Sequence, residues 1–259
     1  MKFEKSVIGM IHVPALPGTP KSKMNMQQIV EHCVQETLLY KQCGLQYIMI
    51  ENMHDIPYMN RKVAPEIVAA MTQIAIQVRS HFEGYIGIQI LAGANKEALA
   101  VAHCAHLDFI RAEGFVFGHV ADEGYIDSCA GELLRYRKFI GAERIVILTD
   151  IKKKHSSHAI TSDIDIADTA HAAEFFLSDG VIVTGTATGN EPDLHELKIV
   201  KKAVKIPVLL GSGITPENIE KYLPYADGFI IGSYFKKDGY WENELEKNRI
   251  LKLMEVLRT

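Results

Sequence analysis

The chain has 259 residues, of which 47% are hydrophobic and 23% charged, with a formal net charge of −4. Such a chain fits one large globular domain or two small ones, with a sizeable core. No basic stripe with interleaved aromatic residues occurs, and no apolar run approaches the roughly 18 residues of a membrane helix, so we expect neither nucleic-acid binding nor membrane insertion.

Eight short apolar runs recur along the chain, and each is followed by a stretch with helical periodicity. The runs lie at residues 6–12, 46–52, 85–91, 108–114, 144–150, 180–185, 206–213 and 227–233. They are almost continuously hydrophobic, as parallel strands covered on both faces require. We predict helices at residues 25–42, 64–82, 95–106, 127–140, 162–177, 190–203, 215–223 and 242–257.

Local signals place several helix starts. Pro65 suits the first position of its helix, where a missing N–H costs nothing. Ser162 or Asp163 is the predicted N-cap of the helix over 162–177, and Thr215 plays that part for 215–223.

Eight strand–helix repeats in about 250 residues predict a closed α/β barrel, the (β/α)₈ or TIM barrel, of the phosphate-binding type. An open doubly wound sheet usually has fewer strands and a G-x-G-x-x-G turn after the first strand, where this chain has "GMIHVPALPG". No linker or repeat array divides the chain. We therefore predict one barrel domain over residues 1–259.

Polar side chains close the eight apolar strands. In such barrels the active site lies at the carboxyl ends of the strands, so residues there are candidates for catalysis, with solvated loop residues as the alternative. The predicted catalytic acid–base groups are His12, Glu51, Glu113, Asp150 and Lys152. The predicted substrate-binding groups are Asn52, Gln89, Arg111 and Thr184.

Asp150 and Lys152 form the closest acid–base pair in this set. Two residues apart on an extended chain, their side chains would share one face. Such a pair can exchange a proton, and a desolvated Lys152 can act as a nucleophile. The neighbouring Lys153 and Lys154 are expected mostly in solvent.

Glycine- and serine-rich turns after the last two strands predict an anion site. Glycines let backbone N–H groups approach a phosphate closely, although each turn alone is also explained by chain geometry. Lys236 or Lys237 would add charge, and the Gly/Thr segment 183–190 would line the same pocket. The predicted phosphate-binding residues are Gly211, Ser212, Gly213, Gly232, Ser233 and Gly185.

A divalent metal is the alternative cofactor, and no other cofactor is predicted. Nitrogen and oxygen ligands are plentiful, but no H-E-x-x-H or comparably close spacing occurs, so no residue is assigned to a metal. The candidate ligands are His12, His54, Asp55, His119, Asp122, His155 and His158.

The four cysteines, at positions 33, 43, 104 and 129, form no C-x-x-C pair. Free thiols in a reducing compartment are the default interpretation. Pro14 and Pro17 interrupt the N-terminal apolar stretch, which we interpret as a strand and not as a signal peptide. The expected location is the cytoplasm.

Several segments together resemble the BtpA/SgcQ family: "IGMIHVPALPG", "ENMHD", "FIRAEGFVFGHVADEG", "DIKKKHSSHAI", "VTGTATG", "PVLLGSGITPENI" and "DGFIIGSYFKKDG". The resemblance runs essentially end to end and implies a TIM barrel with a pocket, but no settled reaction. The family name comes from photosystem I accumulation in photosynthetic bacteria. Nothing in this chain indicates pigment binding, and the family also occurs without photosynthesis, so that role is not carried over.

One segment departs from the family pattern. Many bacterial members follow the third strand with an Arg-Asn-Asp-like stretch, where this chain has Ala92, Gly93 and Ala94. A role that depends on a charged group at that place is therefore not carried over.

Three functions fit these features. The first is an enzyme acting on a small phosphorylated metabolite, such as a sugar phosphate, by isomerisation, aldol-type cleavage or hydrolysis. The second is a non-catalytic binding or assembly factor that keeps the anion pocket, and it predicts tolerance of Asp150→Asn. The third is a metal-dependent hydrolase. A homo-oligomer formed through helix faces, as is common among barrels, is compatible with each of the three functions.

Overall fold

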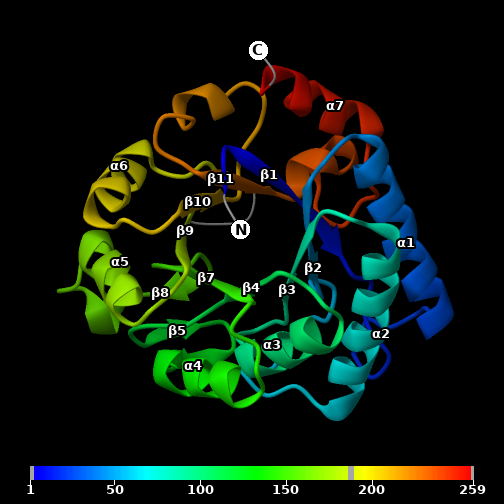
Figure 1. Cartoon of the computed structure of the whole chain (residues 1–259), viewed down its shortest axis with the longest axis horizontal. Helices are drawn as coiled ribbons and strands as arrows, with labels where there is room; N and C mark the ends of the chain where they lie inside the picture. Colours follow the sequence, from blue (N-terminus) through cyan, green and yellow to red (C-terminus); the bar gives the residue numbers. More distant parts are fainter. Residues whose placement is uncertain (1–2, 186–189, 258–259) are drawn as a thin grey trace.

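Eight parallel strands close into a barrel in the computed structural model, which describes residues 3–185 and 190–257. The order around the barrel is β1-β11-β10-β9-β7-β4-β3-β2, so the chain runs once around the ring (Figure 1). The predicted (β/α)₈ barrel is confirmed, and every barrel strand falls within its predicted run. The strands are β1 (Ser6–His12), β2 (Tyr47–Glu51), β3 (Tyr85–Gln89), β4 (Phe109–Ala112), β7 (Val146–Asp150), β9 (Gly180–Thr184), β10 (Val208–Gly211) and β11 (Gly228–Ile231).

Alternate residues of these strands fill two separate apolar regions. One set points into the barrel and forms a cluster that includes Met10, Met49, Phe109, Leu148 and Ile230. The other set points outward and packs against the helices in the larger cluster. Burial on both faces explains the near-continuous hydrophobic runs of the sequence.

Seven α-helices, all within residues 3–185 and 190–257, surround the barrel (Figure 1). They are α1 (Met26–Gln42), α2 (Pro65–His81), α3 (Asn95–Cys104), α4 (Ala130–Phe139), α5 (Ile166–Phe175), α6 (Leu194–Ala203) and α7 (Lys247–Val256). Pro65 is the first residue of α2, as predicted. The N-cap predicted at Ser162 or Asp163 was wrong: Asp165 caps α5, and its side chain accepts from the backbone N–H of Asp168 at 2.8 Å.

The helix predicted over 215–223 is instead a turn followed by a short 3₁₀ helix, η2 (Ile219–Lys221). The Asn218 side chain accepts from the Thr215 N–H at 2.9 Å and donates to the Gly213 carbonyl at 2.8 Å. These side-chain bonds compete with the helical pattern. The backbone after β10 is therefore held close to the strand end.

A small antiparallel sheet that the sequence did not predict joins the loops after β4 and β7. Its strands are β5 (His119–Ala121), β6 (Gly124–Ile126) and β8 (Ser156–Ser157), in the order β6-β5-β8. The 3₁₀ turns η1 (Ala159–Thr161), η3 (Ser233–Phe235) and η4 (Lys237–Gly239) complete the structure. The sheet fixes the loop that carries the lysine run.

The four cysteines, all among the described residues, are free thiols. Within residues 3–185 and 190–257, no helix is long and apolar enough to cross a bilayer.

Candidate functional site

The strand ends line a cavity of about 600 Å³ at the mouth of the barrel. Its walls follow from the two-residue alternation of the strands, because the residue two places beyond an interior residue points to the same side. Met10, Met49, Phe109, Leu148 and Ile230 are interior, and the residues two places beyond them are His12, Glu51, Arg111, Asp150 and Gly232. The predicted site residues that line the cavity are His12, Glu51, Gln89, Arg111, Glu113, Asp150, Ser212, Gly213, Gly232 and Ser233.

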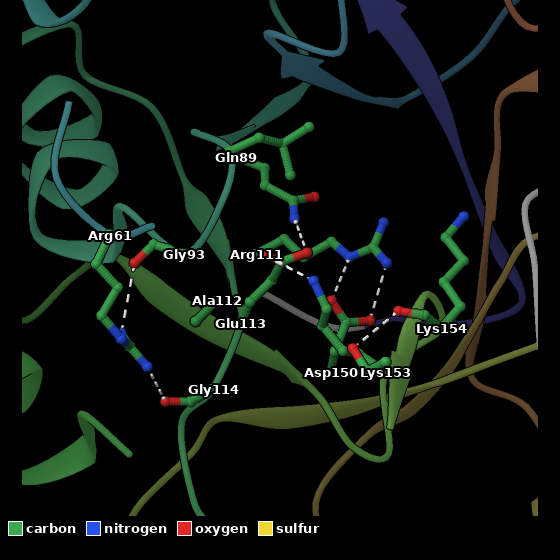
Figure 2. A network of polar contacts seen from close by, with 12 residues as sticks. Arg61, Gln89, Gly93, Arg111, Ala112, Glu113, Gly114, Asp150, Lys153 and Lys154 are labelled. Carbon is green, nitrogen blue, oxygen red and sulfur yellow. Dashed lines mark hydrogen bonds and ion pairs between the residues drawn. The ribbon is translucent and has the colours of Figure 1, made fainter. Parts of the chain in front are cut away.

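Arg111 and Asp150 form a buried two-pronged ion pair in this cavity (Figure 2). The Arg111 Nε donates to Asp150 Oδ2 at 2.9 Å, and Nη2 donates to Oδ1 at 2.8 Å. Burial alone would lower the pKa of Arg111, but the carboxylate more than compensates and raises it. Arg111 therefore stays charged, and the carboxylate of Asp150 is engaged in holding the guanidinium.

Glu113 is the centre of a second polar group beside this pair (Figure 2). Its Oε1 accepts from Gln89 Nε2 at 3.2 Å, and its Oε2 lies 3.3 Å from Lys153 Nζ. Gln89 Oε1 is buried and has no hydrogen-bond partner among the described residues. Lys153, expected in solvent from the sequence, thus belongs to the site.

Glu51 and His12 form the third ionisable group. Their Oε2 and Nε2 atoms lie 3.8 Å apart, and His12 Nδ1 lies 3.2 Å from the Trp241 carbonyl. Burial, with the positive charge of Lys236 second, lowers the pKa of His12 to about 3. Burial raises the pKa of Glu51, opposed by the positive charge of Arg111. The imidazole is therefore neutral near pH 7, and its Nδ1–H donates to the carbonyl.

Two adjacent loops, after β10 and β11, present backbone N–H groups that have no acceptor. Ser212, Gly213 and Ile214 follow β10, and Ser233 and Tyr234 follow β11. In the part of the chain that the structure describes, none of these five N–H groups donates a hydrogen bond. All five residues line the cavity. A bound anion would satisfy several of these donors at once.

Three of the predicted phosphate-binding glycines, Gly185, Gly211 and Gly213, are also packed closely against neighbouring chain segments. A Cβ on Gly185 or on Gly213 would lie 2.2 Å from the Asn190 carbonyl oxygen. A Cβ on Gly211 would lie 3.3 Å from side chains of β9. Gly185 and Gly211 are not among the residues that line the cavity, and ligand contact by either glycine stays a prediction. Residues 186–189 of the predicted Gly/Thr segment lie outside the described residues.

The extended chain predicted from Asp150 through Lys152 is not present, although both residues line a second, smaller pocket. The strand ends at Asp150, and Lys152 has a left-handed backbone with a φ of 46°. Its ammonium donates to the Thr161 carbonyl at 3.2 Å and does not line the large cavity. The turn sends Lys154 into the cavity instead, where its Nζ donates to Ser212 Oγ at 2.7 Å.

Lys236 also lies elsewhere than expected. It is buried against α1, where its ammonium forms an ion pair with Glu36, and only 2% of its side chain is exposed. Lys236 is therefore unable to supply charge to a phosphate by direct contact. Its positive charge affects the site without direct contact, because it lowers the pKa of His12 and of His54.

Asn52 and Thr184 are buried near the strand ends but do not line the cavity. Asn52 bridges two loops by accepting from the Leu91 N–H and donating to Asp55, each at 2.8 Å. Thr184 Oγ1 is buried with no partner among the described residues. Direct substrate contact, predicted for both, is not part of this geometry.

The candidate metal ligands do not converge. Across residues 3–185 and 190–257, no group of three or more His, Cys, Asp or Glu side chains is placed to hold a metal ion. His54 packs on Trp241 with ring centroids 4.9 Å apart, and His119 packs on His158 at 5.5 Å.

Sequence comparison now shows where this chain belongs. The profile of the BtpA family matches residues 3–259. The chain is a member of the BtpA family. A Caenorhabditis elegans relative, named an uncharacterized mitochondrial protein, is 51% identical over 98% of this chain and 93% of its own length. The Synechocystis photosystem I biogenesis protein BtpA is 32% identical over 97% of this chain and 87% of its own length. The resemblance inferred from the sequence motifs is confirmed.

Solved structures similar to this BtpA family member are barrels with little sequence identity. Thiamine phosphate pyrophosphorylase from Pyrococcus furiosus superposes with a TM-score of 0.59 at 15% identity, over 99% of this chain and 96% of that one. Orotidine 5'-monophosphate decarboxylase from Methanocaldococcus jannaschii superposes with a TM-score of 0.59 at 12% identity, over 99% of this chain and 100% of that one. At this identity the likeness supports the fold alone.

Proposed function

We propose that this protein is an enzyme that binds a small phosphorylated metabolite at the barrel mouth and transforms it by acid–base chemistry. The observation that carries the proposal is the set of five N–H groups on the loops after β10 and β11 that have no acceptor among the described residues. In phosphate-binding barrels the last two strand–helix loops hold the anion. The hydroxyls of Ser212 and Ser233 add two further donors.

Proton-transfer groups share the cavity with this anion cradle, by which we mean residues 212–214 and 232–234. Glu51, whose pKa is raised, can donate a proton, and the neutral His12 beside it can accept a hydrogen bond at Nε2. Glu113 and Lys153 form a second acid–base pair. Asp150 keeps Arg111 oriented, so we assign Asp150 a positioning role and not a proton-transfer role.

The position of one basic group in the cavity supports an anionic ligand beside the loops after β10 and β11. Arg111 and Lys153 each face one carboxylate, of Asp150 and Glu113 respectively. Lys154 adds a further basic group beside the cradle. The amine of Lys154 and the N–H donors of the cradle therefore favour a negatively charged group on the β10–β11 side of the mouth.

A thermal-unfolding screen against phosphorylated metabolites, inorganic phosphate and divalent metals tests the proposal. A ligand at about 100 times its Kd should stabilise the fold by roughly 2.7 kcal/mol. We expect phosphorylated compounds to raise the melting temperature with EDTA present. A shift with metals and none with any phosphate compound would favour a metal-dependent hydrolase instead.

Cellular location stays a prediction. We retain the cytoplasm on the basis of the free cysteines, whereas the name of the C. elegans relative places that protein in mitochondria.

A further inference from the structure

The amine of Lys154 lies inside the cavity, directly beside the anion cradle. Its Nζ is 2.7 Å from Ser212 Oγ, and Ser212 is the first residue after β10. Arg111 and Glu51 line the same cavity. A ligand whose phosphate occupies the cradle would therefore present its neighbouring atoms to this amine.

The surroundings of Lys154 increase the fraction of its amine that is neutral. Burial, and next the positive charge of Arg111, lower the pKa of Lys154 to about 8. On the order of a tenth of such amines are unprotonated at pH 7, compared with roughly one in several thousand for an ordinary lysine. An uncharged lysine amine close to another cation is a competent nucleophile toward carbonyl groups.

The other two lysines of the run are placed for different tasks. Lys153 is ion-paired with Glu113, whose Oε2 lies 3.3 Å from its Nζ. Lys152 donates to a backbone carbonyl away from the large cavity. Lys153 and Lys154 thus both line the cavity, and Lys154 is the one whose amine lies beside the anion cradle.

We propose that Lys154 is a catalytic nucleophile that forms an imine with the carbonyl carbon of a phosphorylated aldehyde or ketone. The inference rests on the proposed function, because the cradle must hold the phosphate while the amine attacks. It narrows the substrate class to phosphorylated carbonyl compounds. Among the reactions that fit the cavity, it selects those that pass through an iminium ion, such as aldol-type cleavage and condensation.

The step balances with groups already in the cavity. The neutral Lys154 amine adds to the carbonyl carbon, and one amine proton moves to the carbonyl oxygen, giving a carbinolamine. Glu51, in its protonated form, gives its proton to the carbinolamine hydroxyl. The hydroxyl leaves as water, the C=N bond forms as a cationic iminium, and Glu51 becomes a carboxylate. The negative charge formed on Glu51 balances the positive charge of the iminium, so the net charge of the cavity does not change.

Reductive trapping on the wild-type protein tests this inference. The protein is incubated with dihydroxyacetone phosphate and sodium cyanoborohydride, and modified residues are located by peptide mass spectrometry. We expect one reduced adduct per chain, on Lys154. Trapping should be at least about tenfold faster than with unphosphorylated dihydroxyacetone, because the cradle raises the local concentration of the carbonyl. Saturating inorganic phosphate should slow it.

Two matched variants and a pH series sharpen the experiment. Lys154→Arg keeps the positive charge but has no amine that can form an imine, so the adduct should disappear. Lys152→Arg keeps a donor for the Thr161 carbonyl, and the adduct on Lys154 should persist. The trapping rate should rise with pH and level off above about 8, as the amine loses its proton.

The outcomes separate the two proposals. If phosphate stabilises the protein but Lys154 is trapped no faster than exposed lysines, the imine inference is wrong and the phosphate site stands. In that case a loss of phosphate affinity in Lys154→Met that Lys154→Arg restores would identify Lys154 as a phosphate-binding cation. If phosphate neither stabilises the fold nor slows trapping, the proposed function itself fails.

Discussion

Arg111 and Asp150 lie on neighbouring strands with their side chains on the same side of the sheet. Arg111 is in register with Leu148, and Asp150 is two residues beyond Leu148, so the carboxylate meets the guanidinium through two hydrogen bonds of 2.9 and 2.8 Å. Exposure of the two side chains is 9% and 1%. The pair is buried, and removal of one charge leaves the other uncompensated.

Asp150→Asn should therefore destabilise the fold by about 3–5 kcal/mol, the usual cost of breaking a buried ion pair. Urea unfolding followed by circular dichroism measures the change. Asp163→Asn, at an exposed position, is the control and should stay within about 0.5 kcal/mol of the wild type. A fully stable Asp150→Asn protein would contradict the structural role assigned to the pair and would favour a non-catalytic binding factor.

Gly213 and Gly141 allow a matched test of the loop after β10. Both have a positive φ, of 64° and 69°, which L-residues with a Cβ adopt at a cost of roughly 1–2 kcal/mol. A Cβ on Gly213 would meet the Asn190 carbonyl at 2.2 Å, whereas a Cβ on Gly141 would meet nothing within 4 Å. Gly213→Ala should therefore lower the free energy of unfolding by about 1–3 kcal/mol more than Gly141→Ala does. Equal losses would show that Asn190 does not press against the loop.

His12 should make the fold sensitive to mild acid. Its folded pKa of about 3 lies below the 6.5 of an ordinary histidine, so the unfolded chain binds a proton that the folded one does not. Its contribution to stability is complete above pH 6.5 and is lost as the pH falls toward 3, by about 2 kcal/mol between pH 7 and pH 5. The raised pKa of Glu51 has the opposite effect, because its protonation at lower pH increases the stability of the folded state.

Stability curves of His12→Asn and of the wild type between pH 7 and 5 check this prediction. The variant should lose less stability over that interval, while His171→Asn, at an exposed position, should follow the wild type. Parallel curves for His12→Asn and the wild type would mean that the imidazole is not held neutral.

The barrel was predictable because its signals are repeated eight times. Each strand run is buried on both faces, and Pro65 begins α2 where the sequence predicts it. The antiparallel sheet β6-β5-β8 escaped prediction, because strands of two or three residues show no measurable alternation. The turn in place of a helix at 215–223 depends on the two hydrogen bonds of Asn218, which composition does not reveal.

The sequence predicted those site residues that lie at the ends of strands, but not all of those on the loops beyond them. His12, Glu51, Arg111 and Asp150 followed from the barrel and the two-residue alternation. Lys152 did not, because the alternation stops where the strand stops and its positive φ turns the chain. Trp241 carries no sequence signal for the site at all, since it reaches His12 through a backbone carbonyl.

The central claim is that residues 212–214 and 232–234 bind a phosphate group, and calorimetric titration with inorganic phosphate tests it most directly. Ser212 has a φ of 77°, a backbone region that Asn and Asp tolerate, so Ser212→Asp and Ser212→Asn form a matched pair that should both fold. We predict that the wild type and Ser212→Asn bind phosphate in the presence of EDTA. We also predict that Ser212→Asp binds it at least about tenfold more weakly, because its carboxylate repels the anion. No phosphate binding by the wild type, or equal affinities for the Asp and Asn variants, would contradict the account.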